Sequence, residues 1–157
     1  MKITGKNMKW LIDFFTNPFV VNSFAAWVAA QVIKVFTHAL IYKEFDIKRI
    51  FGDGGMPSAH TATVSSLAIL SGLVYGFGSF NFAVCGIYMV IVCRDAVGVR
   101  QETGKQNMIL NELIKDLKND SFDEIKLKEF VGHTPLQVVG GIVLGAIVAG
   151  LSYWIMF

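Results

Sequence analysis

The sequence is poor in charge. Asp, Glu, Lys and Arg make up only 17% of its 157 residues, whereas 54% of the residues are hydrophobic and 13% are aromatic. A soluble domain of this length would carry more charge on its surface. The formal net charge of +2 is also too small to provide the dense basic stripe that a nucleic-acid groove requires. The composition therefore indicates a membrane protein, and nucleic acid is not an expected partner.

Cysteine is scarce as well. The two cysteines, Cys85 and Cys93, lie eight residues apart inside one apolar run, so they cannot form a disulfide with each other. Neither has His, Cys, Asp or Glu companions at metal-ligand spacing. We therefore interpret both as buried packing residues and expect no metal site and no bound cofactor.

Long hydrophobic runs, in contrast, are present. A helix needs about 20 mostly apolar residues to span the hydrocarbon core of a membrane. Four runs meet or approach this length: residues 19–42, 57–77, 80–99 and 135–157. We predict an all-α, polytopic membrane bundle of about four transmembrane helices, forming a single domain over residues 1–157. The connection at 76–81 is short, so the second and third helices should be antiparallel neighbours.

Two further segments are predicted to be helical without spanning the membrane. Residues 8–15 are short and mixed in polarity, which is typical of a helix in the membrane interface. Residues 101–131 form the longest polar excursion, and apolar residues from Ile109 to Leu117 recur there at helical spacing. Because Lys115 and Asp116 fall on the other side, we expect an amphipathic helix lying on the membrane or on the bundle.

The order of the runs predicts which residues share a membrane face. The first and third runs end, and the second and fourth begin, on one face, which we name the site face. Its basic residues are Lys43, Lys48, Arg49, Arg100, Lys105, Lys115, Lys118, Lys126 and Lys128. The other face has Lys2, Lys6 and Lys9. By the positive-inside rule we expect the site face to be cytoplasmic, in the plasma membrane of a bacterium, although the amino-terminal lysines oppose this orientation.

The first chemical motif precedes the second run. Glycines, including Gly55, lead to Pro57 at the expected first turn of that helix. A helix start offers unpaired backbone N–H groups and a partial positive charge, and glycine lets the backbone approach an anion closely. Ser58 would add a hydroxyl donor and His60 a proton donor. The alternative is structural, with Ser58 as a helix cap and His60 as an interfacial histidine.

The second motif, Gly132-His133-Thr134-Pro135, opens the fourth run in the same manner. Two histidines, His60 and His133, thus stand at two helix starts on the site face. Such a pair suits nucleophilic and acid chemistry on a phosphate, which the positive ends of the helices would also attract.

Charged residues inside apolar runs are costly and need an explanation. Lys34 shares a helical stripe with Gln31 and His38 and lies about two turns from the site face. Its long side chain could reach an anion there or pair with Asp95, and the spacing leaves both alternatives open. Arg100 could bind two phosphate oxygens, and Asp95 could orient it or a histidine.

Several of these segments resemble one protein family. The segment Gly-Gly-Met-Pro-Ser-Ala-His at 54–60 is similar to the Pro-Ser-Gly-His element of the type 2 phosphatidic acid phosphatase superfamily. Residues 132–145 resemble the last motif of that superfamily, in which a His precedes an Asp by four residues and a glycine-bearing helix follows. Together with 95–100 and 104–106, they resemble its divergent branch, distantly related to acid phosphatases and vanadium haloperoxidases. The likeness runs from about Trp27 to Gly145.

This resemblance implies a metal-independent phosphatase that acts on a lipid or isoprenoid phosphate or pyrophosphate. His133 would attack phosphorus to give a phosphohistidine, and His60 would protonate the leaving oxygen. The expected phosphate-binding residues are Ser58, Gly55, Lys34 and Arg100, and the expected supporting residues are Asp95 and Gln137.

The sequence also departs from the superfamily. The first motif, a Lys followed seven residues later by Arg-Pro, is absent, so Lys34, Lys48 or Arg49 would stand in. The Ser-Arg pair before the last His is missing, which leaves Arg100 as its substitute. Gln137 occupies the place of the Asp that orients the histidine, and a neutral amide cannot stabilise the imidazolium as a carboxylate does.

Two other functions stay open at this point. The chain could be a protein that binds or translocates a lipid phosphate without turnover, as Gln137 and the missing arginines would suggest. It could also be a small scaffold whose Lys-rich excursion recruits a soluble partner. Small residues in the fourth run, such as Gly141 and Gly145, would permit close helix contact. A homodimer is a further alternative.

Overall fold

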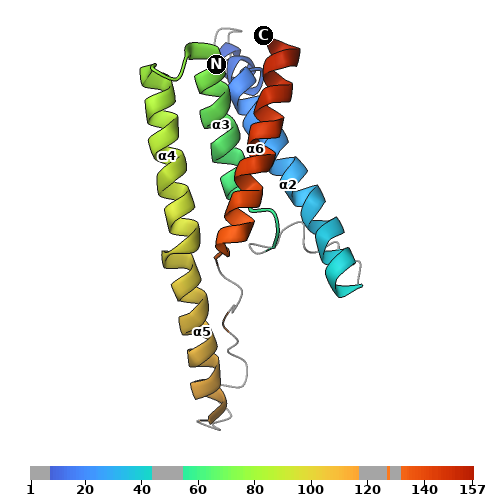
Figure 1. Cartoon of the computed structure of the whole chain (residues 1–157), viewed down its shortest axis with the longest axis vertical. Helices are drawn as coiled ribbons and strands as arrows, with labels where there is room; N and C mark the ends of the chain where they lie inside the picture. The colour runs from blue at the N-terminus through green and yellow to red at the C-terminus, as the bar shows by residue number, and fades with distance from the viewer. Residues whose placement is uncertain (1–7, 44–54, 117–126, 128–131) are drawn as a thin grey trace, which may run out of the picture.

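The computed structural model describes residues 8–43, 55–116, 127 and 132–157, and these ranges are helical without any strand. The helices are α1 (Lys9–Phe15), α2 (Pro18–Tyr42), α3 (Ala59–Tyr75), α4 (Phe80–Val97), α5 (Val99–Asp116) and α6 (Pro135–Met156) (Figure 1). The prediction of an all-α membrane bundle is confirmed. The predicted basic residues Lys2, Lys6, Lys48, Arg49, Lys118, Lys126 and Lys128 lie outside the described ranges.

Side-chain caps fix the residues at which the long helices begin. The capping residues are Asn17 for α2, Ser58 for α3, Ser79 for α4 and Thr134 for α6. The cap of α6 is reciprocal, because the Thr134 hydroxyl accepts the backbone N–H of Gln137 and the Gln137 side chain accepts the backbone N–H of Thr134. Each cap satisfies N–H groups that a helix leaves unpaired, so each start is well defined.

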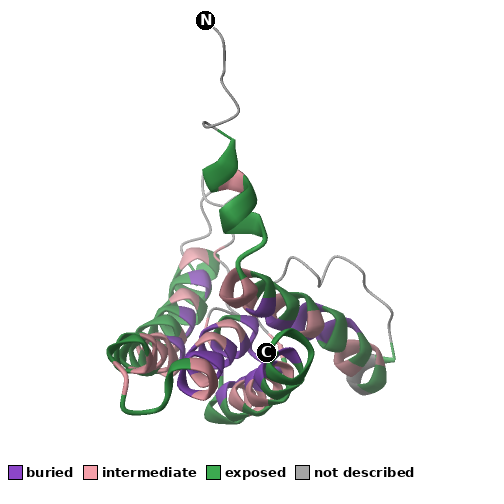
Figure 2. Cartoon of the chain, turned by 90° about the horizontal axis from the view of Figure 1, so that it is seen from above, coloured by how far each residue is buried: buried purple, intermediate pink, exposed green. Residues whose placement is uncertain are grey.

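Helix α3 lies at the centre of the bundle. It packs against α2, α4 and α6, whereas the backbones of α2 and α4 do not come into contact. The contact of α3 with α6 is close because glycines line it. A Cβ on Gly141 would lie 2.7 Å from the Ser58 carbonyl oxygen, and a Cβ on Gly145 would lie 2.6 Å from that of Ala62. The buried residues gather on the helix faces that meet around α3 (Figure 2).

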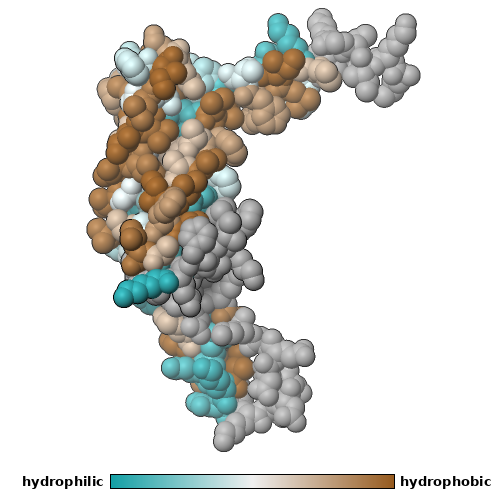
Figure 3. All heavy atoms as spheres, turned by 90° about the vertical axis from the view of Figure 1, so that its right-hand side faces the viewer, coloured by the Kyte–Doolittle hydropathy of each residue, from teal (hydrophilic) through white to brown (hydrophobic). Residues whose placement is uncertain are grey.

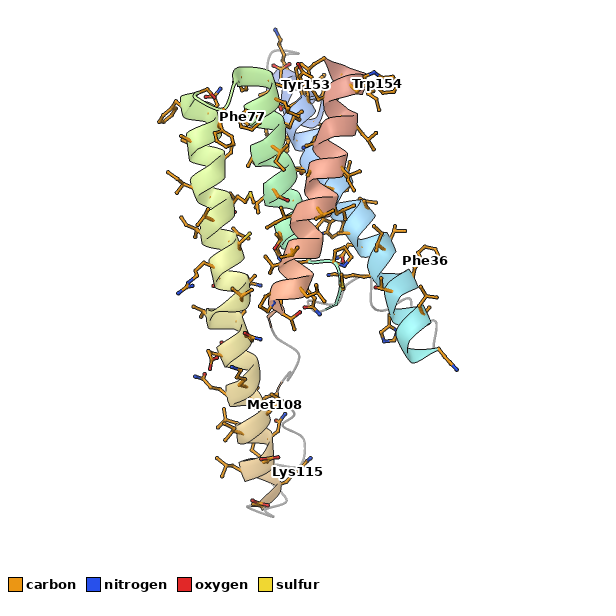
Figure 4. All side chains as sticks on the ribbon, viewed as in Figure 1. Phe36, Phe77, Met108, Lys115, Tyr153 and Trp154 are labelled. Carbon is orange, nitrogen blue, oxygen red and sulfur yellow. The ribbon has the colours of Figure 1, made fainter. Side chains whose placement is uncertain are left out.

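The bundle places small and polar side chains inside and large apolar ones outside. Ala26, Ala62 and Ser65 are fully buried, whereas Phe80 is 81% exposed. Apolar surface covers the bundle, and hydrophilic side chains gather at the end formed by α5 (Figure 3). Tyr153 and Trp154 lie at the opposite end (Figure 4), as aromatic residues do at membrane interfaces. This distribution suits a lipid environment, and the chain is an integral membrane protein.

Three helical stretches are long and apolar enough to cross a membrane: Pro18–Leu40, Phe80–Asp116 and Pro135–Met156. Helix α3 is also apolar, but its 17 residues extend over only about 25 Å. The fourth transmembrane span therefore stays a prediction. As the predicted topology requires, α2 and α4 run toward the end of the bundle at which α3 and α6 begin (Figure 1).

Helix α5 differs from expectation in its direction. The N–H of Gly98 donates to the carbonyl of Arg94 at 2.9 Å, and the N–H of Glu102 donates to the carbonyl of Gly98 at 3.0 Å. The helical path therefore passes through Gly98, so α5 continues α4 beyond the bundle instead of lying on it (Figure 1). At the other end of the bundle, α1 confirms the predicted short helix and points sideways (Figure 2).

Candidate functional site

A cavity of about 380 Å³ lies between α2, α3 and α4 at the end where α3 and α6 begin. Its polar lining consists of His60, Asp95, Arg100 and His133. The rest of the lining is Trp27, Thr63, Val64, Tyr88, Ile91, Val92 and Ala96. Four of the predicted site residues thus share one cavity, and most of its remaining wall is apolar.

The backbone of His133 is held against the junction of α4 and α5. Its N–H donates to the carbonyl oxygen of Ala96 in the last turn of α4, at 3.0 Å. The preceding residue, Gly132, has a φ of +92°, and a Cβ there would lie 2.6 Å from the carbonyl carbon of Arg100. Only glycine fits that position without a shift of the backbone. His133 therefore reaches the cavity from a position 35 residues beyond Gly98, the C-cap residue of α4, since 133 − 98 = 35.

The imidazole of His133 is oriented by Gln137. Its Nδ1 lies 3.2 Å from Oε1 of Gln137, and the same oxygen accepts the backbone N–H of Thr134 at 3.0 Å. Because an amide oxygen only accepts hydrogen bonds, Nδ1 carries the proton. The lone pair of the ring is then on Nε2, which is the atom that a nucleophile would use.

The surroundings of His133 also determine its charge. The residue is only 4% exposed, and this burial lowers the pKa of the imidazole below 6.5. The hydrogen bond with Gln137 opposes the shift, whereas the positive charges of Lys34, His60 and Arg100 lower the pKa further. His133 is therefore neutral at pH 7. The positive charges of Lys34 and Arg100 near a neutral imidazole favour the binding of an anion.

His60 faces His133 across the polar end of the cavity. It stands in the first turn of α3, and the two ring centroids are 6.5 Å apart with the ring planes at 52°. This separation leaves a gap between the rings that a direct hydrogen bond would not span. A group placed between them could come within hydrogen-bond distance, about 3 Å, of both rings.

Arg100 and Asp95 form an ion pair at the edge of the cavity. Nε of Arg100 donates to Oδ2 of Asp95 at 2.8 Å, across the junction of α4 and α5. Orienting Arg100 was one of the two roles expected for Asp95. A guanidinium held through Nε keeps its two terminal nitrogens as further donors, so the pair could present them to an anion.

Ser58, Gly55 and Lys34 do not line the cavity. Ser58 is fully buried; its hydroxyl accepts the N–H and the hydroxyl of Thr61, and its N–H donates to the carbonyl of Gln137 at 3.0 Å. This is the structural role that the sequence left open for Ser58. Lys34 is buried, and a Cβ on Gly55 would lie 3.7 Å from its Cγ. Phosphate binding by these three residues stays a prediction.

Seven lining residues were missed at the level of sequence, and the spacing of three of them carried a signal. Trp27 precedes Lys34 by seven residues, Tyr88 precedes Asp95 by seven, and Thr63 follows His60 by three. Residues three or seven apart share a helix face. Within the described ranges, no group of three or more His, Cys, Asp or Glu side chains is arranged to hold a metal ion.

Comparison with known proteins adds a family to this geometry. Residues 15–148 match the model of a family described as the divergent PAP2 family. The chain is also 35% identical to YuiD, named an uncharacterized membrane protein, of Bacillus subtilis (strain 168). The alignment of 158 residues covers 92% of this chain and 100% of that protein. No solved structure matches the chain.

Proposed function

Because the chain belongs to the divergent PAP2 family, we propose that it is a metal-independent phosphatase that acts on a lipid or isoprenoid phosphate or pyrophosphate through a phosphohistidine. The observation that carries this proposal is the pair of histidines at the polar end of an otherwise apolar cavity. A phosphate between the rings would meet a neutral nucleophile on one side and a proton donor on the other, with apolar walls beside the rest of the molecule.

The proposed reaction has two steps. Nε2 of His133 attacks phosphorus, the bond from phosphorus to the leaving oxygen breaks, and protonated His60 gives its proton to that oxygen. Water then attacks the phosphohistidine while neutral His60 takes a proton from it, which releases phosphate and restores the lone pair of His133. Lys34 and Arg100 supply positive charge near His133, and such charge stabilises the oxygens of the transferring group.

The direct test is phosphate release by the purified protein in detergent, with and without a chelator, from a panel of lipid phosphates and prenyl pyrophosphates. We expect release that resists the chelator and that His133→Ala and His60→Ala each abolish. His38→Ala is the matched control, because the third histidine of the chain does not line the cavity. No release from a folded wild-type protein on any of these substrates would refute the phosphatase.

Gln137 favours one alternative function. It orients His133 without a negative charge, so the phosphoimidazolium would lack the stabilisation that a carboxylate gives. A protein that binds or translocates a lipid phosphate needs only the anion site. This alternative predicts headgroup binding that survives His133→Ala and no trapped phosphohistidine in the wild type after acid-free quenching. Phosphate on His133, found by mass spectrometry, would exclude it.

A further inference from the structure

Two apolar hollows, which together we name the groove, adjoin the cavity at the histidines. The cavity, as the first hollow, shares Trp27 and Thr63 with the second, and the second shares Phe19 and Leu67 with the third, which reaches Tyr75. The three hollows follow one another along α3, from its first turn at the site end to its last residue at the opposite end of the bundle. Outside the histidine end, the surface that lines them is almost entirely apolar.

The arrangement of helices explains the groove. Helices α3 and α2 line all three hollows, and α4 lines the first and the third; α2 and α4 both pack against α3 but not against each other. At the far end, the rings of Phe19 from α2 and Tyr75 from α3 stack with centroids 5.4 Å apart. This aromatic pair joins the two helices there. The row of hollows therefore has a polar end at the histidines and an aromatic end opposite.

The length of the groove limits what can fill it. Tyr75 lies 15 residues beyond His60, since 75 − 60 = 15, which corresponds to about 22 Å along a helix. The hydrocarbon layer of one leaflet is only about 15 Å, half of the 30 Å core. A chain that fills the groove from the histidines must therefore pass the midplane of the bilayer.

We propose that this groove binds the hydrocarbon chain of a single-chain lipid phosphate that is longer than one leaflet, with the phosphate at His60 and His133. The inference rests on the proposed binding of a lipid phosphate at the histidines. Its support is that the cavity and the groove share Trp27 and Thr63 in their linings. The three hollows follow one another in a single row along α3, so the proposed ligand has one chain, and a diacyl lipid would leave its second chain outside.

Cys85 provides a probe inside the groove. It is a free cysteine that lines the part nearest Tyr75, ten residues before Asp95 on α4, or about 15 Å along the helix. The full chain carrying Cys93→Ser keeps Cys85 as its single cysteine. Alkylphosphonates are suitable ligands because their carbon–phosphorus bond resists hydrolysis, and a maleimide at the chain end would react with the thiol. Intact-protein mass spectrometry measures the labelling rate.

We expect the hexadecyl phosphonate to label Cys85 at least tenfold faster than the hexyl phosphonate, and the same maleimides on alkyl alcohols to show no such preference. Unlabelled hexadecyl phosphonate should protect Cys85 from a soluble maleimide, whereas dioleoyl phosphatidate should protect it much less. Labelling rates that do not depend on chain length, or equal protection by both lipids, would overturn the proposal.

Blocking the groove gives an independent arm. Leu67→Trp should fill it between the histidines and Cys85 and slow labelling by the hexadecyl phosphonate at least tenfold, with Leu67→Phe as a milder variant. Ile147→Trp is the matched control, because Ile147 is exposed on α6 and outside the groove. Unchanged labelling in folded Leu67→Trp protein would also overturn the proposal. If Leu67→Trp does not fold, Leu67→Phe and the chain-length series decide.

The outcomes separate this inference from the phosphatase. If labelling of Cys85 depends on chain length but the protein releases no phosphate from any substrate, the proposal of a lipid-binding groove is supported and the phosphatase is refuted. If the protein releases phosphate but the labelling rate does not depend on chain length, the phosphatase is supported and the proposal of a lipid-binding groove is refuted.

Discussion

The orientation of His133 by an amide is the most consequential contact of a single residue. Gln137 accepts both the Nδ1–H of His133 and the backbone N–H of Thr134, so one side chain caps α6 and sets the tautomer of the histidine. The two tasks need an acceptor at this position, and a carboxylate would serve both. Gln137 thus keeps the geometry of an oriented histidine while it omits the charge.

The first prediction concerns that omitted charge. Gln137→Glu retains the acceptor of the capping box and places a negatively charged carboxylate beside Nδ1–H of His133. If the phosphohistidine mechanism is correct, the rate of phosphate release should rise about tenfold, which corresponds to about 1.4 kcal/mol of transition-state stabilisation. Gln137→Leu should lower the rate and weaken the cap. Steady-state rates on one lipid phosphate test both variants, and a slower Glu variant would argue against a developing imidazolium.

The second prediction concerns pH. Burial lowers the pKa of His133 in the folded protein, so the unfolded chain binds its proton at a higher pH than the folded protein does. Stability rises with pH wherever the unfolded state binds more protons. The free energy of unfolding should therefore fall as pH drops from about 7.5 to about 5.5, through the ordinary histidine pKa of about 6.5. His133→Gln should lose less stability over this range in thermal unfolding, whereas an equal loss would contradict the assignment.

Among single residues, the sequence was informative where a residue lies at the end of a helix. His60, Arg100 and His133 could be found because each lies next to a predicted boundary, and topology brings those boundaries together. The spacing of Trp27, Thr63 and Tyr88 from site residues was a signal, but it did not single them out, because apolar and weakly polar side chains are common on every face of a membrane helix. Ser58 could be a cap or a ligand, and only the hydrogen bonds with Thr61 reveal the cap.

Among the helices, the close contact of α3 with α6 has the strongest effect on the site. It holds Ser58 and Gln137 together through a backbone hydrogen bond and so places both histidine-bearing helix starts at one level. The contact depends on glycines of α6 at which a Cβ would collide with the backbone of α3.

The third prediction tests this contact. Gly145→Ala should destabilise the bundle by about 1–3 kcal/mol, because its Cβ would overlap backbone atoms of Ala62 and Ser66. Gly150→Ala on the same helix is the control, since no atom lies within 4 Å of its Cβ position. That variant should be neutral or more stable by about 0.5–1 kcal/mol, as alanine is preferred to glycine in a helix. Denaturant titration in detergent compares them, and equal stabilities would contradict the close contact.

Helix boundaries were predictable to within a few residues because local chemistry determines them. Asn17 before Pro18, and Thr134 before Pro135, are start signals that need no tertiary information. The direction of α5 was not predictable in this way. The amphipathic pattern of α5 fits a helix that lies on a surface. In the structure α5 instead continues in the direction of α4, and this direction depends on the backbone of the single residue between them, Gly98.

In the part of the chain that the structure describes, the polar site residues gather at one end of the bundle. The histidines, the ion pair of Arg100 and Asp95, and all of α5 lie toward that end, and the aromatic residues of α6 mark the other (Figure 4). We predict that the end with the histidines faces the cytoplasm, because most of the basic residues of the sequence are expected there.

The fourth prediction is this orientation. Lys115→Cys on α5, in a background with Cys85→Ser and Cys93→Ser, should react with a membrane-impermeant maleimide only after the cells are permeabilised. A cysteine appended after Phe157 is the matched probe for the other face and should react in intact cells. The opposite pattern would reverse the assigned sidedness and leave the groove and the site unchanged.

The separation of α2 from α4 has a kinetic consequence. If the proposed lipid phosphate enters between these helices from the bilayer, it reaches the histidines by lateral diffusion and never has to leave the membrane. The quantity that saturates such a site is the surface density of the ligand, that is, its mole fraction among the surrounding lipids, and not its concentration in the assay volume. Diluting the ligand with inert phospholipid at constant bulk concentration should therefore slow the reaction, whereas diluting the whole suspension of vesicles should leave the turnover per molecule unchanged.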